Sequence, residues 1–175
     1  MLLNIAAMSP DDDLHWYAVY TAPRAEKKVS ERFRQDSIEH YLPLHTVKRK
    51  WSDRVKEVEV PVVNGYIFVN IAKSQFKEVL NTYGALSFVR EFGTPVIIPD
   101  QQIQRLRFMI ECSDETVEIC TETILPGEVI EVVKGPLQGL IGELVTLKGK
   151  HKVIIRLEKF GCAKTEVPLS FLQKI

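Results

Sequence analysis

The side chains that could bind a metal or perform covalent chemistry are scattered along this sequence of 175 residues. The three cysteines, Cys112, Cys120 and Cys162, have no C-x-x-C spacing, and the four histidines form no His-x-x-x-His pair. Zinc sites and disulfide frameworks need such spacings, and an odd cysteine count without a motif fits a reducing compartment. Catalytic triads, phosphate-binding glycine loops and paired inward carboxylates are also missing from the sequence. We therefore predict a protein that is not an enzyme and needs no metal or cofactor.

Positive charge is concentrated between residues 24 and 56, although the net charge of the whole chain is zero. Ten basic and five acidic residues give this segment a local charge of +5. The run Lys48-Arg49-Lys50-Trp51 places an aromatic ring beside three cations, a combination suited to a nucleic-acid backbone and its bases. The alternative is a solvated hairpin, and the sequence leaves both open. The candidate contact residues are Arg24, Lys27, Lys28, Lys48, Arg49, Lys50 and Arg54.

The pattern of apolar residues predicts the elements that position these side chains. The strongest predicted strand is 65–71, whose apolar residues alternate between two faces. Other predicted elements are strands at 15–20 and 39–44, a hairpin with arms at 46–51 and 54–60, a β unit at 88–99, and helices at 24–36, 73–82 and from Asp100 onward. Strands interleaved with short helices predict an α+β domain at 15–110, with an antiparallel sheet and helices on one face.

The composition changes after this first domain. No basic residue occurs between Arg107 and Lys134, whereas acidic residues accumulate there. We predict an acidic linker at 111–125 and a second domain at 126–175. Its predicted strands, at 128–133, 142–147, 152–157, 162–168 and 171–175, are short and punctuated by glycines. That pattern is typical of a small β-barrel.

The first fourteen residues are predicted to be a flexible tail. Their apolar run is short, is interrupted by Asn4 and is followed by the acidic run 11–13, which does not fit a signal peptide. No stretch approaches the ~20 apolar residues that a membrane span needs. We expect a soluble, cytoplasmic protein without a membrane partner.

Taken together, residues 15–175 resemble the NusG family of transcription elongation factors. In the first domain the resemblance lies in Trp16-Tyr17-Ala18-Val19, Tyr41-Leu42-Pro43, Gly65–Val69 and Gly93–Pro99. Four parts of this domain most resemble the specialised RfaH-like and UpxY-like antitermination paralogues: Tyr20, Pro61-Val62-Val63, Tyr66–Val69 and Phe88–Pro99. The second domain carries a KOW motif from Pro126 to Leu144. The resemblance implies a NusG-type N-terminal α/β sandwich followed by a small SH3-like KOW β-barrel.

The resemblance also implies a function: a factor that promotes processive transcription of particular operons. In the family an apolar concavity binds the clamp helices of the largest RNA polymerase subunit, and the matching residues are Tyr20, Val63, Tyr66 and Ile97. The basic residues would contact the DNA bubble or the nascent RNA. Leu137, Leu140 and Phe160 match KOW positions that dock the termination factor Rho or a small-subunit ribosomal protein. For each set the alternative is ordinary core or loop packing.

A rival interpretation is an RNA-binding or ribosome-associated KOW protein without polymerase contact. The segment Asn64–Ile71 partly imitates the aromatic strand of an RNA-recognition motif. Association with polymerase that survives nuclease treatment would favour the elongation factor. Nuclease-sensitive association with ribosomes would favour the rival.

Overall fold

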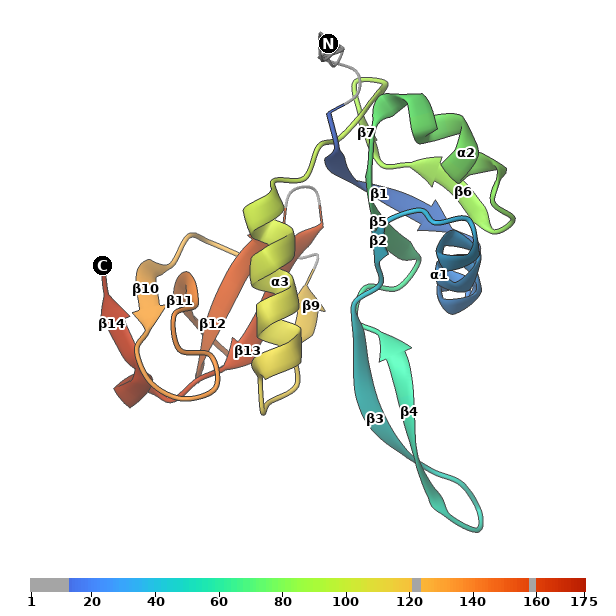
Figure 1. Cartoon of the computed structure of the whole chain (residues 1–175). Helices are drawn as coiled ribbons and strands as arrows, with labels where there is room; N and C mark the ends of the chain where they lie inside the picture. The colour runs from blue at the N-terminus through green and yellow to red at the C-terminus, as the bar shows by residue number, and fades with distance from the viewer. Residues whose placement is uncertain (1–12, 121–123, 158–159) are drawn as a thin grey trace, which may run out of the picture. The chain divides into compact units, whose positions relative to one another are not determined.

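The computed structural model describes residues 13–120, 124–157 and 160–175 (Figure 1). The predicted tail therefore lies almost wholly outside the described residues. The described chain divides into two compact units. The first unit comprises the residues up to Leu42 together with Asn64–Pro99, and the second comprises Pro43–Val63 together with Asp100–Ile175. None of the helices in the described ranges is long and apolar enough to cross a membrane.

The first unit is built on a four-stranded antiparallel sheet with the order β2-β5-β1-β6. The strands are β1 (His15–Thr21), β2 (His40–Tyr41), β5 (Tyr66–Ile71) and β6 (Ala85–Phe88). The other elements are α1 (Glu26–Gln35), the 3-10 turn η1 (Lys73–Gln75), α2 (Phe76–Asn81) and a small hairpin of β7 (Arg90–Glu91) and β8 (Thr94–Pro95). The predicted α+β class and its principal strands and helices are confirmed.

One face of this sheet forms the core with the two helices. Tyr17 and Val19 of β1 are buried there together with Ile67 of β5, because alternate residues of a strand share a face. Val29 and Phe33 of α1 pack against them at a spacing of four residues, which places both on one side of the helix. Tyr20 and Tyr66 belong to the alternate positions and therefore lie on the opposite face of the sheet.

The basic segment 44–61 forms a two-stranded antiparallel hairpin of its own, β3 (Leu44–Lys50) and β4 (Val55–Pro61). The strands pair in continuous register from Leu44 opposite Pro61 to Lys50 opposite Val55. The Trp51 amide donates to the Arg54 carbonyl oxygen at 2.8 Å, which leaves Ser52 and Asp53 at the turn as the sequence predicts.

In the second unit a six-stranded antiparallel sheet follows α3 (Asp100–Cys112) in the chain. The strands are β9 (Glu118–Cys120), β10 (Glu128–Val132), β11 (Ile141–Leu147), β12 (Lys150–Leu157), β13 (Gly161–Glu166) and β14 (Leu172–Lys174), with the 3-10 turn η2 (Leu169–Phe171) before the last. Their order in the sheet is β14-β10-β11-β12-β13-β9. The five strands predicted after Pro126 are confirmed, and closure into a KOW barrel stays a prediction.

Strand β9 is the main addition to the predicted elements. It lies within the segment predicted as a linker and pairs antiparallel with β13 at the end of the sheet. The Ser113 and Thr165 hydroxyls, 3.1 Å apart, add a contact between the chain before β9 and β13. The predicted division of the chain at residue 110 stays a prediction.

Candidate functional site

The first candidate surface is a pair of tyrosines on the sheet face opposite the helices. Tyr20 and Tyr66 are cross-strand partners on β1 and β5, and their ring centroids lie 4.6 Å apart with the planes tilted by 41°. The Tyr20 side chain is 40% exposed, so the pair presents aromatic surface to solvent. Burial raises the pKa of Tyr66 to about 12, and the hydrogen bond with Tyr20 and the charge of Tyr20 add to this effect. The Tyr66 hydroxyl is therefore neutral and can serve a partner as a hydrogen-bond donor or acceptor.

The backbone before Tyr66 is held by a buried carboxylate. The Gly65 amide donates to Glu26 Oε1 at 2.8 Å, and the Gly65 carbonyl oxygen accepts from the Thr21 amide at 2.9 Å. Glu26 lies in the first turn of α1 and is itself buried. These contacts tie the start of α1 to the start of β5, so the tyrosine pair stands on a rigid support.

The other two predicted polymerase contacts are Ile97, which lies away from the tyrosines along β1, and Val63, which is buried. Ile97 is 47% exposed, but its neighbour Ile98 pairs with Trp16, near the opposite end of β1 from Tyr20. Four residues of extended strand separate Trp16 from Tyr20, or about 13 Å. Val63 is buried with 5% of its surface exposed, so its side chain offers little to a partner.

The sequence analysis missed Phe92, the most exposed large apolar residue among those described. It is fully exposed and lies with Gly93 at the turn between β7 and β8. Both residues have positive φ, 48° and 83°, as type I′ hairpin turns require. A glycine after an aromatic residue, inside a short β unit, is the sequence signal that could have located this turn.

A basic groove lies between the start of α1 and the segment that leads into β6. It has a volume of about 650 Å³, and its lining includes Arg24, Lys28 and Arg32. The Arg32 Nη1 atom donates to the Tyr83 carbonyl oxygen at 2.8 Å, and its guanidinium lies 5.1 Å from the centre of the Tyr83 ring. Two of the predicted nucleic-acid contacts, Arg24 and Lys28, thus share one groove, whereas Lys27 is exposed on α1 outside this lining.

The hairpin divides its predicted contacts between two faces. Cross-strand partners share a face, and Arg49 is opposite Lys56, so both lie with Trp51 and Arg54 on one side. That side presents three cations and a ring. Lys48 and Lys50 lie on the other side, where the Lys48 Nζ atom is 3.9 Å from the Glu57 carboxylate. The sequence predicted the cluster, but only the strand register separates its members.

The predicted docking residues of the second unit are not surface residues. Leu137, Leu140 and Phe160 are all buried, with at most 5% of their surface exposed. Their burial leaves these side chains little area for a partner, and docking through this part of the chain stays a prediction. The low exposed fractions of the three side chains fit the alternative, ordinary loop packing.

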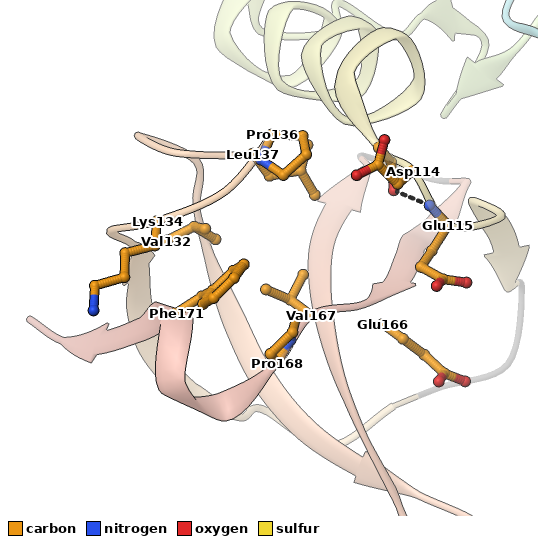
Figure 2. A pocket seen from close by; sticks show the side chains of 11 residues that line it. Asp114, Glu115, Val132, Lys134, Pro136, Leu137, Glu166, Val167, Pro168 and Phe171 are labelled. Atoms are coloured by element: carbon orange, nitrogen blue, oxygen red, sulfur yellow. Dashed lines mark hydrogen bonds between the residues drawn. The ribbon is translucent and has the colours of Figure 1, made fainter.

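Beside this loop lies a pocket of about 180 Å³ (Figure 2). Its apolar lining includes Val132, Leu137 and Phe171, while Glu115 and Glu166 line it with their carboxylates pointing away from these side chains. Gly135 sits in the loop with φ of 84°, and a Cβ atom there would lie 2.6 Å from the Phe171 ring. The glycine therefore allows the ring to approach the loop backbone.

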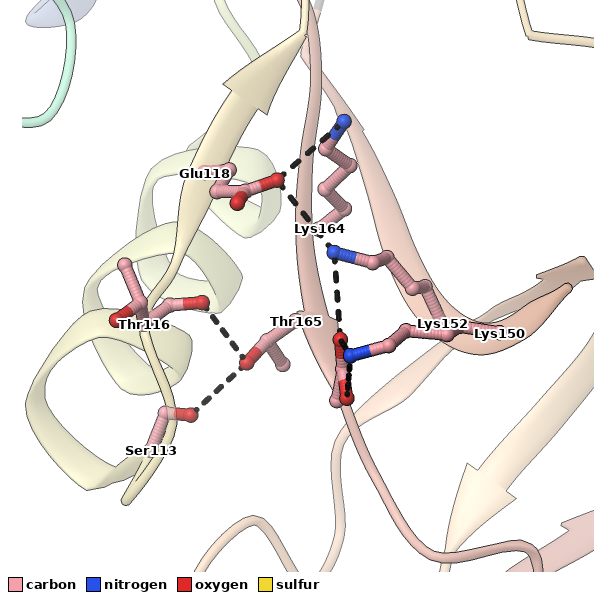
Figure 3. A network of polar contacts seen from close by, with 8 residues as sticks. Ser113, Thr116, Glu118, Lys150, Lys152, Lys164 and Thr165 are labelled. Carbon is pink, nitrogen blue, oxygen red and sulfur yellow. Dashed lines mark hydrogen bonds and ion pairs between the residues drawn. The ribbon is translucent and has the colours of Figure 1, made fainter. Parts of the chain in front are cut away.

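Ion pairs cover the end of the sheet where β9 joins it (Figure 3). The Glu118 carboxylate lies 3.4 Å from both Lys152 Nζ and Lys164 Nζ. Burial alone would raise the pKa of Glu118, but the two ammonium groups outweigh it and lower the pKa. Strand β9 is thus held by backbone pairing with β13 and by ion pairs with lysines of β12 and β13.

A second carboxylate is held by an arginine. Arg156 Nε donates to Glu143 Oε1 at 2.7 Å and Nη2 to Oε2 at 2.8 Å, a bidentate geometry. The Gly127 amide donates to the same carboxylate at 2.9 Å. The Arg156 hydrogen bonds lower the pKa of Glu143 against the opposing effect of burial. Within the described ranges no cluster of three or more His, Cys, Asp or Glu side chains could hold a metal ion.

Comparison with known proteins decides the family. The model of the family described as "Transcription termination factor nusG" matches residues 14–107, more than half of the chain. The chain belongs to the NusG family. The "Transcription termination/antitermination protein NusG" of Rickettsia bellii is 26% identical over 184 residues, covering 97% of this chain and 94% of the relative. The protein of the same name from Streptococcus pyogenes serotype M1 is 25% identical over 163 residues, covering 85% and 89%.

The fold comparison agrees with this membership. A solved structure described as "Domain interaction in Thermotoga maritima NusG" aligns with a TM-score of 0.54 at 17% identity, covering 93% of this chain and 98% of that one. At this identity the likeness concerns the fold alone. Membership makes this chain a NusG-family transcription termination/antitermination factor.

Proposed function

We propose that this chain binds the clamp helices of the largest RNA polymerase subunit and promotes processive transcription of particular operons. The observation that carries the proposal is the Tyr20–Tyr66 pair on two central strands of a NusG-family domain, in which Tyr20 is exposed and Tyr66 half-buried. Docking of a helix into a groove relies on aromatic anchors that are already rigid in the free protein. Both rings stand on paired strands, and the Glu26 contact with Gly65 fixes the backbone beside them.

Two further apolar side chains are proposed as a separate patch that contacts the same partner. Phe92 and Ile97 flank the short β8 strand, and both are exposed. Burying a fully exposed phenylalanine contributes roughly 1.5–3 kcal/mol, which gives Phe92 more to offer than the buried Val63. We therefore replace Val63 with Phe92 in the proposed set of contacts.

The nucleic-acid contact is proposed for the hairpin face that carries Trp51. Arg49, Arg54 and Lys56 share that face with the ring, and all four side chains are exposed. Cations that neutralise phosphates beside a stacking ring suit the DNA bubble or the nascent RNA, and such contacts hold without reading sequence. Lys48 and Lys50 face away from the ring and serve as the matched comparison.

The direction of the effect, read-through rather than termination, rests on the resemblance of the first domain to the RfaH-like and UpxY-like paralogues. Leu137 and Leu140 do not bear on the direction, because their buried side chains neither enlarge nor reduce a docking surface. We propose residues 126–175 as a KOW barrel that docks Rho or a small-subunit ribosomal protein. In the proposed docking, the buried Leu137 and Leu140 side chains support the loop and do not contact the partner.

The rival function, an independent RNA-binding protein, is weakened by one observation. An RNA-recognition strand needs exposed rings on which bases stack. Phe68, the ring that the imitation of that motif requires beside Tyr66, has 1% of its surface exposed. We therefore rank polymerase binding above RNA binding.

Transcription in vitro tests the proposal. Polymerase from the source organism transcribes a template that carries the proper upstream leader, a pause and a terminator, with and without the full chain. We expect shorter pauses and more full-length RNA, because a factor that binds the moving state more tightly than the paused state shifts the enzyme toward it. Unchanged pausing and termination would remove the proposed direction and leave only family membership.

A further inference from the structure

Two of the three cysteines face each other across paired strands of the second unit. Cys120 ends β9 and Cys162 is the second residue of β13, and the two are direct partners in the antiparallel register. Partners in antiparallel strands have Cα atoms about 4.5–5.5 Å apart. Disulfides span Cα separations of about 4.4–6.8 Å. The backbone therefore already holds these cysteines at a distance that a disulfide can bridge.

An ion pair supports this register independently. Glu118 and Lys164 are the next partners on the same face, two residues along each strand. Their charged groups meet, with Glu118 Oε2 3.4 Å from Lys164 Nζ (Figure 3). Side chains on this face of the β9–β13 pair thus reach across to each other, which is what a bridge between the cysteines requires.

The surroundings of the two thiols are apolar and unequal in exposure. Cys162 is buried, with 2% of its surface exposed, and packs with Val145 and Ile154. Cys120 is partly buried and packs against the same cluster. Cys112, at the end of α3, belongs to no such pair. A reagent can therefore reach the Cys120 thiol more readily than the buried Cys162 thiol.

We propose that Cys120 and Cys162 are a redox-modification site, at which a small-molecule disulfide such as oxidised glutathione converts the two thiols into a reversible cross-strand disulfide. The Cys120 thiolate attacks one sulfur of the oxidant, forms a mixed disulfide and releases one glutathione thiolate. The Cys162 thiolate then attacks the Cys120 sulfur and releases the second. Two protons and two electrons leave the protein, and one oxidant molecule becomes two reduced thiols.

The bridge would act on the connection between α3 and the sheet. In the reduced chain β9 is a three-residue strand at the end of the sheet, held by pairing with β13 and by the Glu118 ion pairs. Short terminal strands of this kind open locally at low cost. A covalent link from Cys120 to Cys162 removes that opening, so oxidation fixes β9 against β13.

Burial sets how fast the bridge closes. It raises the pKa of the Cys162 thiol above its ordinary value, with the charge of Cys120 as the next contribution. Only the thiolate attacks, so the second step is slow at neutral pH and accelerates as the pH rises toward that pKa. A mixed disulfide at Cys120 is accordingly expected as a detectable intermediate.

The test is thiol mapping of the full chain in buffers of graded oxidised and reduced glutathione. After acid quenching, alkylation and digestion, we expect loss of two of the three thiols, a peptide pair linked through Cys120 and Cys162, and an alkylated Cys112. A reductant should restore all three thiols. In the oxidised chain, hydrogen exchange of the β9 amides should slow by about tenfold or more, because the opening that exposes them is blocked.

Three variants separate this outcome from general oxidation. Cys112→Ser should form the bridge unchanged. Cys162→Ala should stop at a glutathione adduct on Cys120, and Cys120→Ala should leave Cys162 unmodified. A wild-type chain that gives only glutathione adducts, or a bridge that involves Cys112, at every buffer ratio would overturn the proposal. That result stands even if a variant fails to fold.

Discussion

The two faces of the β3–β4 hairpin allow a matched comparison of two variants. Each variant loses two positive charges, but the charges are removed from opposite faces of the hairpin. The variant Arg49→Gln/Lys56→Gln loses two cations from the face that carries Trp51. The control variant Lys48→Gln/Lys50→Gln loses two cations from the opposite face. Both changes lower the net charge by two at exposed positions of one hairpin. A nucleic acid that merely senses overall charge responds equally to both.

The expected magnitude follows from counterion release. Each phosphate contact contributes about 0.7 to the slope of log affinity against log salt for a single strand, and about 0.9 for a duplex. Losing two contacts should therefore flatten the slope by about 1.4–1.8. Over a fourfold change in salt concentration, the ratio of wild-type to variant affinity should change by about tenfold. The control variant should leave the slope within a fraction of one contact.

The assay is the affinity of the full chain for an assembled transcription complex, measured by fluorescence anisotropy over a salt series. Circular dichroism confirms that each variant is folded. If the two variants flatten the slope equally, the contact does not depend on the Trp51 face and the assignment of that face fails. If neither changes the slope, the hairpin is solvated in the complex and its basic residues have no phosphate partners.

Three further outcomes are expected. Tyr66→Ala should weaken polymerase binding by about 2 kcal/mol, or roughly thirtyfold. Tyr66→Phe keeps the ring and should lose less binding affinity. Normal binding by a folded Tyr66→Ala chain would exclude the tyrosine pair as an anchor. Gly135→Ala should lower the free energy of unfolding in a urea titration more than Gly139→Ala does. Both glycines have positive φ, but only a Cβ atom at Gly135 would meet the Phe171 ring. Equal losses of stability would mean that the Phe171 ring moves aside freely. Glu143→Gln should cost about 1 kcal/mol of stability at pH 7, and the cost should shrink as the pH falls through the folded-state pKa. The reason is that a carboxylate whose pKa is lowered in the folded state contributes stability above its unfolded pKa and loses it as it becomes protonated. A loss independent of pH would assign Glu143 a packing role instead.

The sequence predicted the elements with strong local signals. The 65–71 strand, the hairpin turn at Ser52-Asp53 and the five strands after Pro126 are where alternation and turn residues place them. Strand β9 was missed because three residues, Glu118–Cys120, carry too little pattern, and their pairing with β13 comes from distant sequence. Non-local pairing of this kind is decided by packing and not by propensity.

The candidate surfaces show the same division. Tyr20 and Tyr66 could be placed on one sheet face from the period of two, and their pairing follows from the antiparallel register. The burial of Leu137, Leu140 and Phe160 could not be predicted, because a loop leucine is equally consistent with docking outward and packing inward. The facing of Cys120 and Cys162 required the register of a strand that the sequence did not reveal.

The central claim is that this chain contacts RNA polymerase itself, and binding to nucleic-acid-free enzyme tests it most directly. The full chain is immobilised, and polymerase purified from the source organism is treated with nuclease before it is applied. We predict saturable binding that survives the nuclease and that Tyr66→Ala weakens. Binding that disappears with the nucleic acid, together with nuclease-sensitive association of the chain with ribosomes, would contradict the account and favour the RNA-binding rival.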